Sequence, residues 1–349
     1  MILCPARLEP TFSLRPWGAR SLAPLFPEKS DLAEPIGEAW MTGNESRFIS
    51  GPFAGKTLGE SWPAMPSEWA GTAADRSSAF PLLVKFIFAE DKLSVQVHPD
   101  DDYAAKHEHG GRGKTEMWYI LQARPGAEVL AGLQPGVTRE SFRHAIESGT
   151  AENCLAHVPL RAGDAVFVPA GTAHTIGAGL KLCEIQEQSD TTYRVYDYNR
   201  RDAQGRSREL HIEKALEVMR FGPQRGGKLQ PARIERNGVT KTIFIACRHF
   251  ETEKWEFGDA ARGNTSPEHF ELLITLEGSG EFRSSGGPGA AYAPAQVWML
   301  PAALGAYELA ARSRTSILRT YVPRDLAEVS RYFSGAGIPE ADAARLIYQ

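Results

Sequence analysis

Residues 163–174 read Gly-Asp-Ala-Val-Phe-Val-Pro-Ala-Gly-Thr-Ala-His (GDAVFVPAGTAH), and the fold prediction starts from this stretch. The apolar run 165–168 lies between a glycine and a proline, which is typical of a short buried strand bounded by turns. Pro169 and Gly171 are turn formers. We therefore expect a strand, a tight turn and then His174, whose position the turn determines.

Short strands of the same kind recur through the middle of the first half. They are apolar or alternating runs separated by Gly, Pro and Asp, at 82–88, 93–97, 117–121, 154–159, 165–168 and 180–186. Helical patterns are confined to 139–148 behind Thr138 as an N-cap, 211–221 and 323–349. The chain is therefore predicted to be mainly β, a sandwich or barrel with a few helices, and residues 1–80 to wrap around it.

The second half of the chain echoes the first. Residues 269–282 (HFELLITLEGSGEF) and 296–309 (QVWMLPAALGAYEL) resemble 116–129 (EMWYILQARPGAEV) and 165–176 (AVFVPAGTAHTI). A basic, Pro/Gly-rich stretch, 222–233, is typical of a linker between the copies. Ala306 stands at the place of His174, so we assign metal chemistry to the first copy. We predict a catalytic unit at 1–221, which includes the N-terminal segment and inserted helices, and a degenerate unit at 236–349, which ends in a helix.

Size and charge limit the classes of function. The 349 residues are 42% hydrophobic and 23% charged, which is ordinary globular composition with length for two cores. A net charge of -4 gives no general attraction to nucleic acid or an anionic membrane, so we expect a small partner held by local Arg and Lys. Four scattered cysteines, no long apolar run and no secretory pattern at the start predict a soluble, cytoplasmic protein with reduced thiols. The cysteines are Cys4, Cys154, Cys183 and Cys247.

Four polar residues form the clearest chemical pattern. Gln96 and His98 alternate by two on a predicted strand, so both side chains point to the same face. Glu116 begins another strand and His174 follows a third, so a closing barrel would bring the four groups together. Two imidazoles, one carboxylate and one amide oxygen suit a divalent ion such as zinc, with a position open to water or substrate. Such an open site is catalytic rather than structural.

Other candidates have structural alternatives. His107 and His109 form a His-x-His pair, but the glycines and charges around them predict an exposed loop. Lys85, inside the apolar run LLVKFIF, either faces solvent from an edge strand or is buried for a functional reason. Trp17 either packs the N-terminal segment against the core or lines the pocket.

The spacing G-x5-P-x-G-x2-H within 163–174 resembles the second sequence motif of the cupin superfamily, whose fold is a jelly-roll variant. Cupin metal sites usually begin with His-x-His, whereas here Gln96 replaces the first histidine and Glu116 follows His98 by eighteen residues. These features resemble type I mannose-6-phosphate isomerases of the shorter bacterial form. The resemblance covers most of the chain and is carried by 16–18 (PWG), 38–41 (EAWM), 83–100 (LVKFIFAEDKLSVQVHPD), 113–119 (GKTEMWY) and 192–198 (TYRVYDY).

The resemblance implies two cupin barrels, one Zn²⁺ per chain and interconversion of mannose 6-phosphate and fructose 6-phosphate. It implies that the zinc ligands are Gln96, His98, Glu116 and His174. It also implies catalytic roles for Arg194, Lys114 and Glu184, and substrate binding by Lys85 and Ser94, to which we add Trp17 as a candidate.

The implied reaction moves a proton between C2 and C1 of the sugar through a cis-enediolate, whose negative oxygen needs stabilisation. A divalent ion supplies this as a Lewis acid, with Lys114 or Arg194 assisting. The base is either Glu184, whose pKa would rise on an apolar strand, or Lys114, whose pKa would fall on desolvation near the cation. The phosphate needs charged donors, for which Arg194, Lys85 and Ser94 are candidates.

Alternatives stay open at this level. Another sugar-phosphate isomerase with the same site has the same sequence pattern, and a non-catalytic sugar-binding cupin would share the fold. The presence of all four ligand positions with Lys114 and Arg194 favours an enzyme. Zinc, manganese and cobalt all suit the ligand set. We expect a small-molecule sugar phosphate as partner, no nucleic acid or membrane, and a monomer or weak homodimer.

Overall fold

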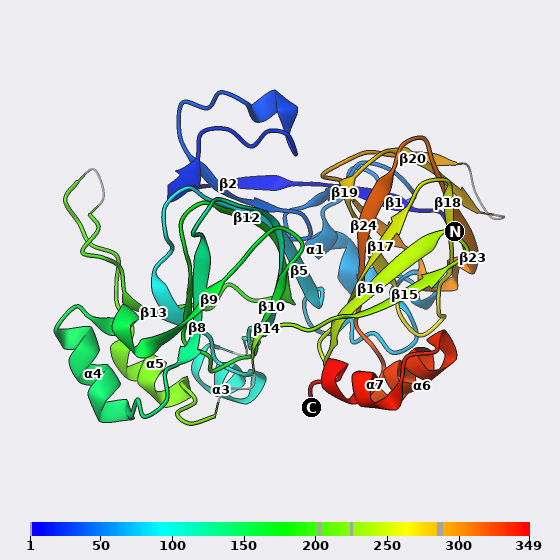
Figure 1. The fold of residues 1–349 in the computed structure, drawn as a ribbon. Coiled ribbons are helices and arrows are strands. Elements are labelled where there is room, and N and C mark those ends of the chain that lie inside the picture. The colour runs from blue at the N-terminus through cyan, green and yellow to red at the C-terminus, as the bar shows by residue number, and fades with distance from the viewer. Residues whose placement is uncertain (1, 110, 202–203, 224–225, 285–288) are drawn as a thin grey trace.

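The computed structural model describes residues 2–109, 111–201, 204–223, 226–284 and 289–349. Figure 1 shows two β units side by side, with most of the helices along one side of them. The prediction of a mainly β protein with a few helices is therefore confirmed. Hydrogen bonds join the described strands into four open sheets, and none of these closes into a barrel.

The first unit consists of two sheets packed face to face. The larger sheet has the order β14 (Gly227–Lys228), β10 (Ala165–Val168), β7 (Glu116–Ala123), β12 (Leu180–Glu187), β5 (Leu82–Ala89), β3 (Ile36–Trp40), β2 (Thr11–Ala19). The smaller has the order β13 (Tyr193–Tyr196), β6 (Val95–Val97), β11 (His174–Ile176), β8 (Glu128–Leu133), β9 (Leu155–Pro159). Trp118 and Leu182 of the larger sheet pack in one core with Val129 and Ile176 of the smaller sheet.

The second unit is built in the same way. Its larger sheet has the order β15 (Ala232–Arg236), β16 (Val239–Ala246), β17 (Glu251–Phe257), β24 (Thr315–Tyr321), β19 (Glu271–Glu277), β22 (Val297–Leu300), β1 (Ala6–Glu9), β4 (Arg47–Phe48). Its smaller sheet has the order β18 (Ala260–Asn264), β23 (Ala306–Ala311), β20 (Gly280–Ser284), β21 (Ala290–Tyr292). Leu273 and Ile317 of the larger sheet share a core with Phe282 and Leu309 of the smaller one.

The strand orders of the two units match one another. The run β10-β7-β12-β5-β3-β2 in the first unit corresponds to β22-β19-β24-β17-β16-β15 in the second, and β6-β11-β8-β9 corresponds to β18-β23-β20-β21. Register agrees as well, because Glu116 pairs with Val168 and Glu271 pairs with Leu300. These matches are what a duplication would produce, and Glu271 occupies the place of Glu116.

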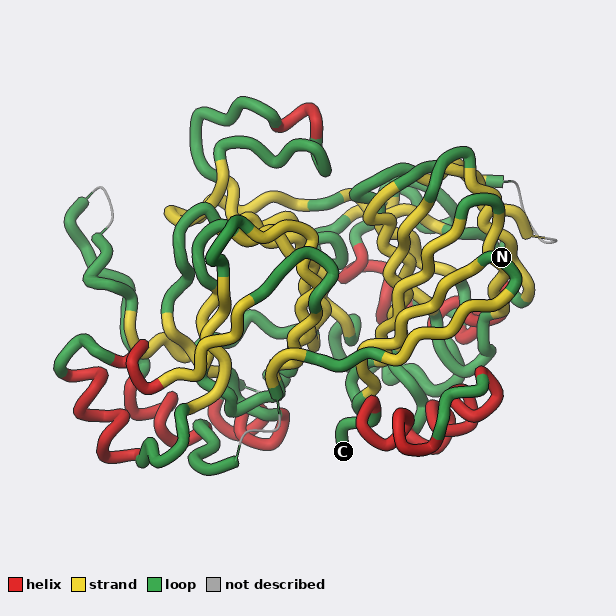
Figure 2. The backbone as a smooth tube through the Cα atoms, in the orientation of Figure 1, coloured by secondary structure: helices red, strands yellow, loops and turns green. Residues whose placement is uncertain are grey.

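The described helices are α1 (Leu58–Ser61), α2 (Ser67–Ala70), α3 (Asp101–His107), α4 (Arg139–Glu147), α5 (Ile212–Val218), α6 (Leu326–Ala336) and α7 (Glu340–Leu346), with 3₁₀ turns at Pro27–Lys29, Trp62–Ala64, Ala151–Cys154 and Ala302–Leu304. Four of them, α4 to α7, lie in the three predicted regions, whereas the short helices α1, α2 and α3 were not predicted (Figure 2). Thr138 caps α4 as expected, accepting the backbone N–H of Ser141 at 3.2 Å. No helix within the described ranges is long and apolar enough to cross a membrane.

Two chain segments link the units more closely than a simple two-unit division suggests. Of the predicted linker 222–233, residues 227–228 form β14 on the first unit and 232–233 begin β15 of the second. In the N-terminal segment, β1 and β4 belong to the second unit's sheet, whereas β2 and β3 belong to the first unit's sheet. A single apolar cluster, which contains Trp62, Phe80 and Phe270, includes residues of both units.

A buried ion network fills the interior of the second unit. The Arg319 guanidinium lies 2.6 Å from Oε1 of Glu271 and 3.0 Å from Oε1 of Glu253. The Tyr307 hydroxyl donates to Glu271 at 3.0 Å, and the Trp255 indole donates to Glu253 at 2.8 Å. Burial alone would raise the pKa of Glu253, but the positive charge of Arg319 lowers it below its ordinary value. Arg319 thus supplies a counter-charge to both buried carboxylates, and Lys241, with Nζ 3.8 Å from Oε1 of Glu253, adds to it.

Replacing this arginine should destabilise the protein strongly. Arg319→Met keeps the volume but leaves buried carboxylates without their counter-charge, which costs about 3–5 kcal/mol in such pairs. Urea unfolding at pH 7.5 measures the loss. Arg262→Met is the matched control, because Arg262 pairs with Glu308 at the surface and is 83% exposed. A loss for Arg319→Met no larger than that of this control would show that the network does not hold the second unit together.

Candidate active site

Three strands of the first unit bring the four predicted metal ligands together. Gln96 lies on β6, and His98 directly follows that strand. His174 is the first residue of β11, and the register of β6 and β11 places it opposite Gln96. Glu116 is the first residue of β7 and comes from the opposite sheet of the unit. The site therefore lies between the two sheets of the first unit.

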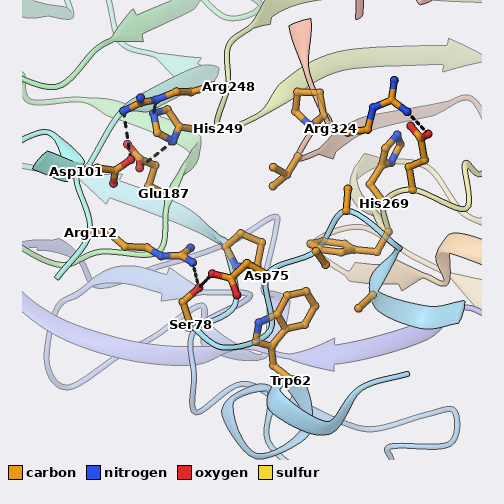
Figure 3. Close-up of a pocket in the computed structure, with 18 of the residues that line it drawn as sticks. Trp62, Asp75, Ser78, Asp101, Arg112, Glu187, Arg248, His249, His269 and Arg324 are labelled. Atoms are coloured by element: carbon orange, nitrogen blue, oxygen red, sulfur yellow. Dashed lines mark hydrogen bonds and ion pairs between the residues drawn. The ribbon is translucent and has the colours of Figure 1, made fainter. Parts of the chain in front are cut away.

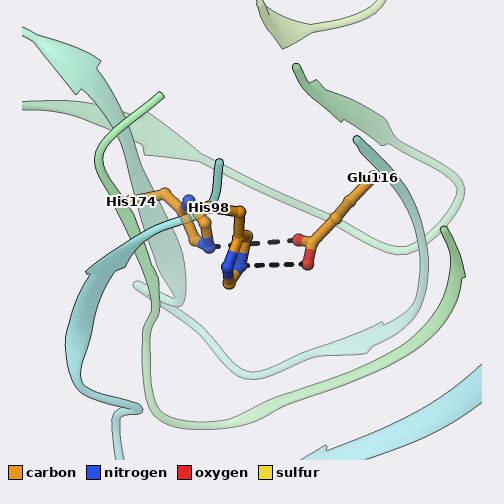
Figure 4. A group of neighbouring side chains, drawn as sticks. All are labelled: His98, Glu116 and His174. Carbon is orange, nitrogen blue, oxygen red and sulfur yellow. Dashed lines mark ion pairs between the residues drawn. The ribbon is translucent and has the colours of Figure 1, made fainter. Parts of the chain in front are cut away.

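His98 and His174 present the same ring nitrogen to the Glu116 carboxylate (Figure 4). Nε2 of His98 lies 3.2 Å from Oε1 of Glu116, and Nε2 of His174 lies 3.9 Å from Oε2. Nδ1 of each ring is 2.9 Å from a backbone carbonyl oxygen, that of Thr191 for His98 and that of Thr172 for His174. A carbonyl only accepts, so each Nδ1 carries the proton and each Nε2 offers a lone pair. Two lone pairs and a carboxylate facing one another are the donor set of a divalent metal ion.

Burial sets the protonation states of this group. It lowers the pKa of His98 to about 3, with help from the Lys114 ammonium, and it also lowers the pKa of His174. Burial alone would raise the pKa of Glu116, but the Lys114 ammonium outweighs it and holds that pKa well below its usual range. Two neutral imidazoles and one carboxylate result, which are the forms that bind metal ions.

Lys114 contacts the same group. Its Nζ lies 2.5 Å from Oε1 of Glu116 and 3.2 Å from Nε2 of His98. Burial alone would lower the pKa of Lys114, but the Glu116 and Glu184 carboxylates raise it instead. This direction is opposite to the one on which a Lys114 base would depend.

A cavity of about 480 Å³ adjoins the metal-type group. Gln96 and Glu116 line it directly, and the buried His98 and His174 lie next to them. Every other residue singled out for catalysis or substrate binding also lines it: Trp17, Lys85, Ser94, Lys114, Glu184 and Arg194. The candidates therefore converge on one cavity, although they are scattered along the sequence.

Glu184 and Lys85 form a buried pair on one wall. They lie opposite each other on β12 and β5, with Nζ and Oε1 4.0 Å apart. Lys85 also lies 4.4 Å from the centre of the Trp40 ring and 3.7 Å from Oδ1 of Asp190, so it is buried within a polar cluster and not exposed on an edge strand. Burial raises the pKa of Glu184 to about 7, and the negative charge of Glu116 adds to this shift.

Three arginines gather in another part of the cavity. Nε of Arg194 donates to the Ser94 hydroxyl at 3.2 Å. Arg15, Arg194 and Arg208 all line the cavity, burial lowers the pKa of Arg194, and the positive charges of Arg208 and Arg15 lower it further. Such a concentration of positive charge favours an anionic ligand. Sequence reasoning missed Arg15, which directly precedes the PWG motif, and Arg208, which lies in an irregular stretch without a motif.

The remaining alternatives are resolved by position. His107 and His109 are both exposed, and His107 stacks on Tyr103 with ring centres 4.1 Å apart, away from the cavity. Trp17 is 3% exposed and has both expected roles, since it belongs to the core of the first unit and lines the cavity.

Fold and site together define a class: a β protein of two matching units with a buried His–Glu–His metal-type group beside a cavity suited to a small anion. Residues 6–122 match the family model for the phosphomannose isomerase type I catalytic domain. A probable mannose-6-phosphate isomerase from Bacillus subtilis is 38% identical over 286 residues, which are 81% of this chain and 89% of that protein. A mannose-6-phosphate isomerase from Streptococcus mutans is 38% identical over 79% of this chain and 86% of its own. The chain belongs to the type I phosphomannose isomerase family.

Solved structures agree with this assignment. A mannose 6-phosphate isomerase from Bacillus subtilis superposes with a TM-score of 0.82 at 32% identity, covering 90% of this chain and 99% of that one. A phosphomannose isomerase variant from Salmonella typhimurium, at 15% identity and a TM-score of 0.71, shares the fold over 91% of this chain and 99% of its own. The family resemblance inferred from the sequence motifs is confirmed.

Removing either histidine should abolish tight metal binding. His98→Ala and His174→Ala each delete a lone pair from a three-residue donor set. Mutating residues that only hydrogen-bond to metal ligands typically lowers affinity up to about 100-fold, so we expect the loss of a ligand itself to lower zinc affinity by more than that. Competition with a chromophoric chelator measures the affinity. His157→Ala is the control, since His157 is exposed and paired with Glu128 away from the cavity. Unchanged zinc affinity in both site variants would rule out these residues as ligands.

Proposed function

We propose that this protein is a zinc-dependent aldose–ketose isomerase that interconverts mannose 6-phosphate and fructose 6-phosphate through a cis-enediolate. One observation carries the proposal. The His98–Glu116–His174 group, the Glu184 carboxyl and the arginine cluster all adjoin the same 480 Å³ cavity. The reaction needs a metal-type group at the sugar oxygens, a base at the carbon that loses its proton and cationic groups at the phosphate. The names of the relatives support the same reaction.

Zinc would be held by Gln96, His98, Glu116 and His174. The Gln96 amide lies 3.3 Å from Nε2 of His174, and a half-turn of the amide exchanges its nitrogen for its oxygen. Nitrogen and oxygen donors of this kind suit zinc and leave a position for the sugar. When bound, the ion supplies Lewis-acid stabilisation of negative charge on the substrate oxygens.

Glu184 is the proposed base that moves the proton between C2 and C1. A carboxyl with a pKa of about 7 is able both to accept the proton and to return it near neutral pH. Lys114, whose pKa is raised, keeps its proton and is proposed to stabilise the developing negative oxygen of the enediolate. Lys85 pairs with Glu184 and would hold its carboxyl toward the sugar.

The phosphate is proposed to bind at the arginine cluster. Arg194 and the Ser94 hydroxyl are already hydrogen-bonded to each other, which pre-orients both as donors. Arg208 is held by a bidentate contact with Asp197, at 2.8 and 2.5 Å, and Arg15 by Glu38 at 2.8 Å. Guanidinium groups match the oxygens of a phosphate dianion, and fixed ones lose little entropy on binding it.

The finer architecture belongs to the same proposal. We infer that each unit is a cupin-type jelly roll, with the metal site confined to residues 1–221 and none in 236–349. The matched strand orders and the facing sheets support this. The four free cysteines, three of them buried, support a cytoplasmic location. We propose a monomer or weak homodimer.

Turnover of mannose 6-phosphate in a coupled assay tests the proposal. The purified protein should be active, lose activity on chelation and regain it with zinc, because a chelator removes the ion whose Lewis-acid stabilisation the proposed reaction needs. Manganese and cobalt are tested in parallel for the metal preference. His174→Ala should remain inactive with any of them. If the zinc-loaded protein does not convert mannose 6-phosphate, the proposed substrate is wrong.

The pH profile tests the role of Glu184. Because the carboxylate is the active form, kcat/KM should fall as pH drops through about 7, well above the ordinary range of a glutamate. Glu184→Gln should lower kcat about 10²–10⁴-fold, the usual contribution of a general base, and remove this acid limb. Glu90→Gln, at an exposed ion pair with Arg124, is the control. A normal rate and profile in Glu184→Gln would exclude Glu184 as the base.

A further inference from the structure

The backbone that carries Lys114 is held by two carboxylates. The N–H of Gly113 donates to Oδ1 of Asp101 at 2.9 Å, and the N–H of Thr115 donates to Oε1 of Glu187 at 2.8 Å. The approach is close, because a side chain at Gly113 would lie 2.6 Å from the backbone nitrogen of Asp101. The backbone of Lys114 is therefore fixed from both sides, and Glu116, two residues later, begins β7.

The second unit holds these two carboxylates in turn. Arg248 and His249 lie in the turn between β16 and β17. Nδ1 of His249 lies 2.9 Å from Oε2 of Glu187, and the Arg248 guanidinium lies 3.3 Å from Oδ2 of Asp101. Nε of Arg248 also donates to Nε2 of His249 at 2.9 Å. Figure 3 shows the four side chains together at one edge of a cavity of about 440 Å³ between the units.

This cluster is not built as a metal site, although Asp101, Glu187 and His249 are close enough to share an ion. Both ring nitrogens of His249 are engaged, because Nε2 accepts from Arg248 and Nδ1 must then be the donor to Glu187. No lone pair of the ring is left for a metal. The guanidinium supplies the positive charge that the carboxylates need.

We propose that Arg248 and His249 are positioning residues of the isomerase reaction. Through Glu187 and Asp101 they fix the backbone of residues 113–115, and so hold Lys114 and Glu116 against His98. This assigns the degenerate second unit a role in catalysis without a group that touches the substrate. His249 is the main contact, since its side chain is 17% exposed, whereas Arg248 is 68% exposed and its pairing is weakened by solvent. The inference rests on the proposed isomerase function.

Three variants test it: His249→Ala, His249→Asn and the control His157→Ala. Asn places an amide N–H where Nδ1 of histidine lies, so it keeps the donor to Glu187, whereas Ala removes it. Displacing catalytic groups by a fraction of an ångström costs rate, so we expect kcat to fall about tenfold in His249→Ala with KM changed less than about twofold. His249→Asn should recover most of kcat. His157 is also a histidine with Nδ1 2.9 Å from a glutamate, but it lies away from the site, and its variant should match wild type.

A second readout does not depend on turnover. Amide hydrogen exchange in the peptide spanning 113–116 should be faster in His249→Ala than in wild type and restored in His249→Asn, with exchange elsewhere in the first unit unchanged. Should His249→Ala unfold, the milder Arg248→Ala is measured in the same way.

The outcomes separate the two proposals. Wild-type kcat and wild-type exchange in His249→Ala would overturn the positioning role and leave the isomerase assignment intact. A loss of kcat that His249→Asn does not restore, or that comes without faster exchange at 113–116, would also overturn it. If the wild-type protein fails to convert mannose 6-phosphate, the proposed function falls, while the exchange measurement still decides whether the second unit holds the segment.

Discussion

The site depends on one ionised carboxylate, that of Glu116, which is 1% exposed. Removing a carboxylate from water costs several kcal/mol, and one opposite charge about 4 Å away returns about 4 kcal/mol at the effective dielectric constant typical of proteins. A single opposite charge at that distance would therefore barely offset the cost of burying the carboxylate. Lys114 at 2.5 Å and the Trp118 indole, which donates at 3.0 Å, provide close compensation. Both histidines turn a lone pair toward the same carboxylate, so the site as a whole favours an added cation.

The second unit buries a carboxylate at the same place and stabilises it differently. Glu271 corresponds to Glu116 in register. Glu184 pairs with the residue two positions after Glu116, and Arg319 pairs with the residue two positions after Glu271, so Arg319 occupies the position of Glu184. Arg319 brings a permanent positive charge to Glu271 at 2.6 Å, and Tyr307 completes the contacts. A fixed guanidinium leaves no need for a metal ion, so an ion network that stabilises the core takes the place of a reactive centre.

The two units are also joined by more than a linker. The N-terminal segment supplies strands to both larger sheets, and the apolar cluster around Trp62 and Phe270 is shared between them. The charged contacts of Arg248 and His249 lie at the same junction. Close packing between the units transmits small displacements, since packed interiors deform little. The geometry around Lys114 is for this reason a property of the whole chain.

The sequence by itself determined the β class, the regions of the four helices α4 to α7, and the family, but not the short helices α1 to α3. The family resemblance, carried by short motifs, also supplied most of the residues that line the cavity. The roles of Arg15 and Arg208 were not predicted, since no motif includes them and only folding brings them near Arg194. The properties that distinguish Glu184 from Lys114 as the proposed base also depend on the tertiary structure. Burial raises the pKa of Glu184, whereas neighbouring carboxylates raise the pKa of Lys114 against the effect of burial. Desolvation and Coulomb interactions act through space between strands distant in the chain, so no local pattern of residues encodes them.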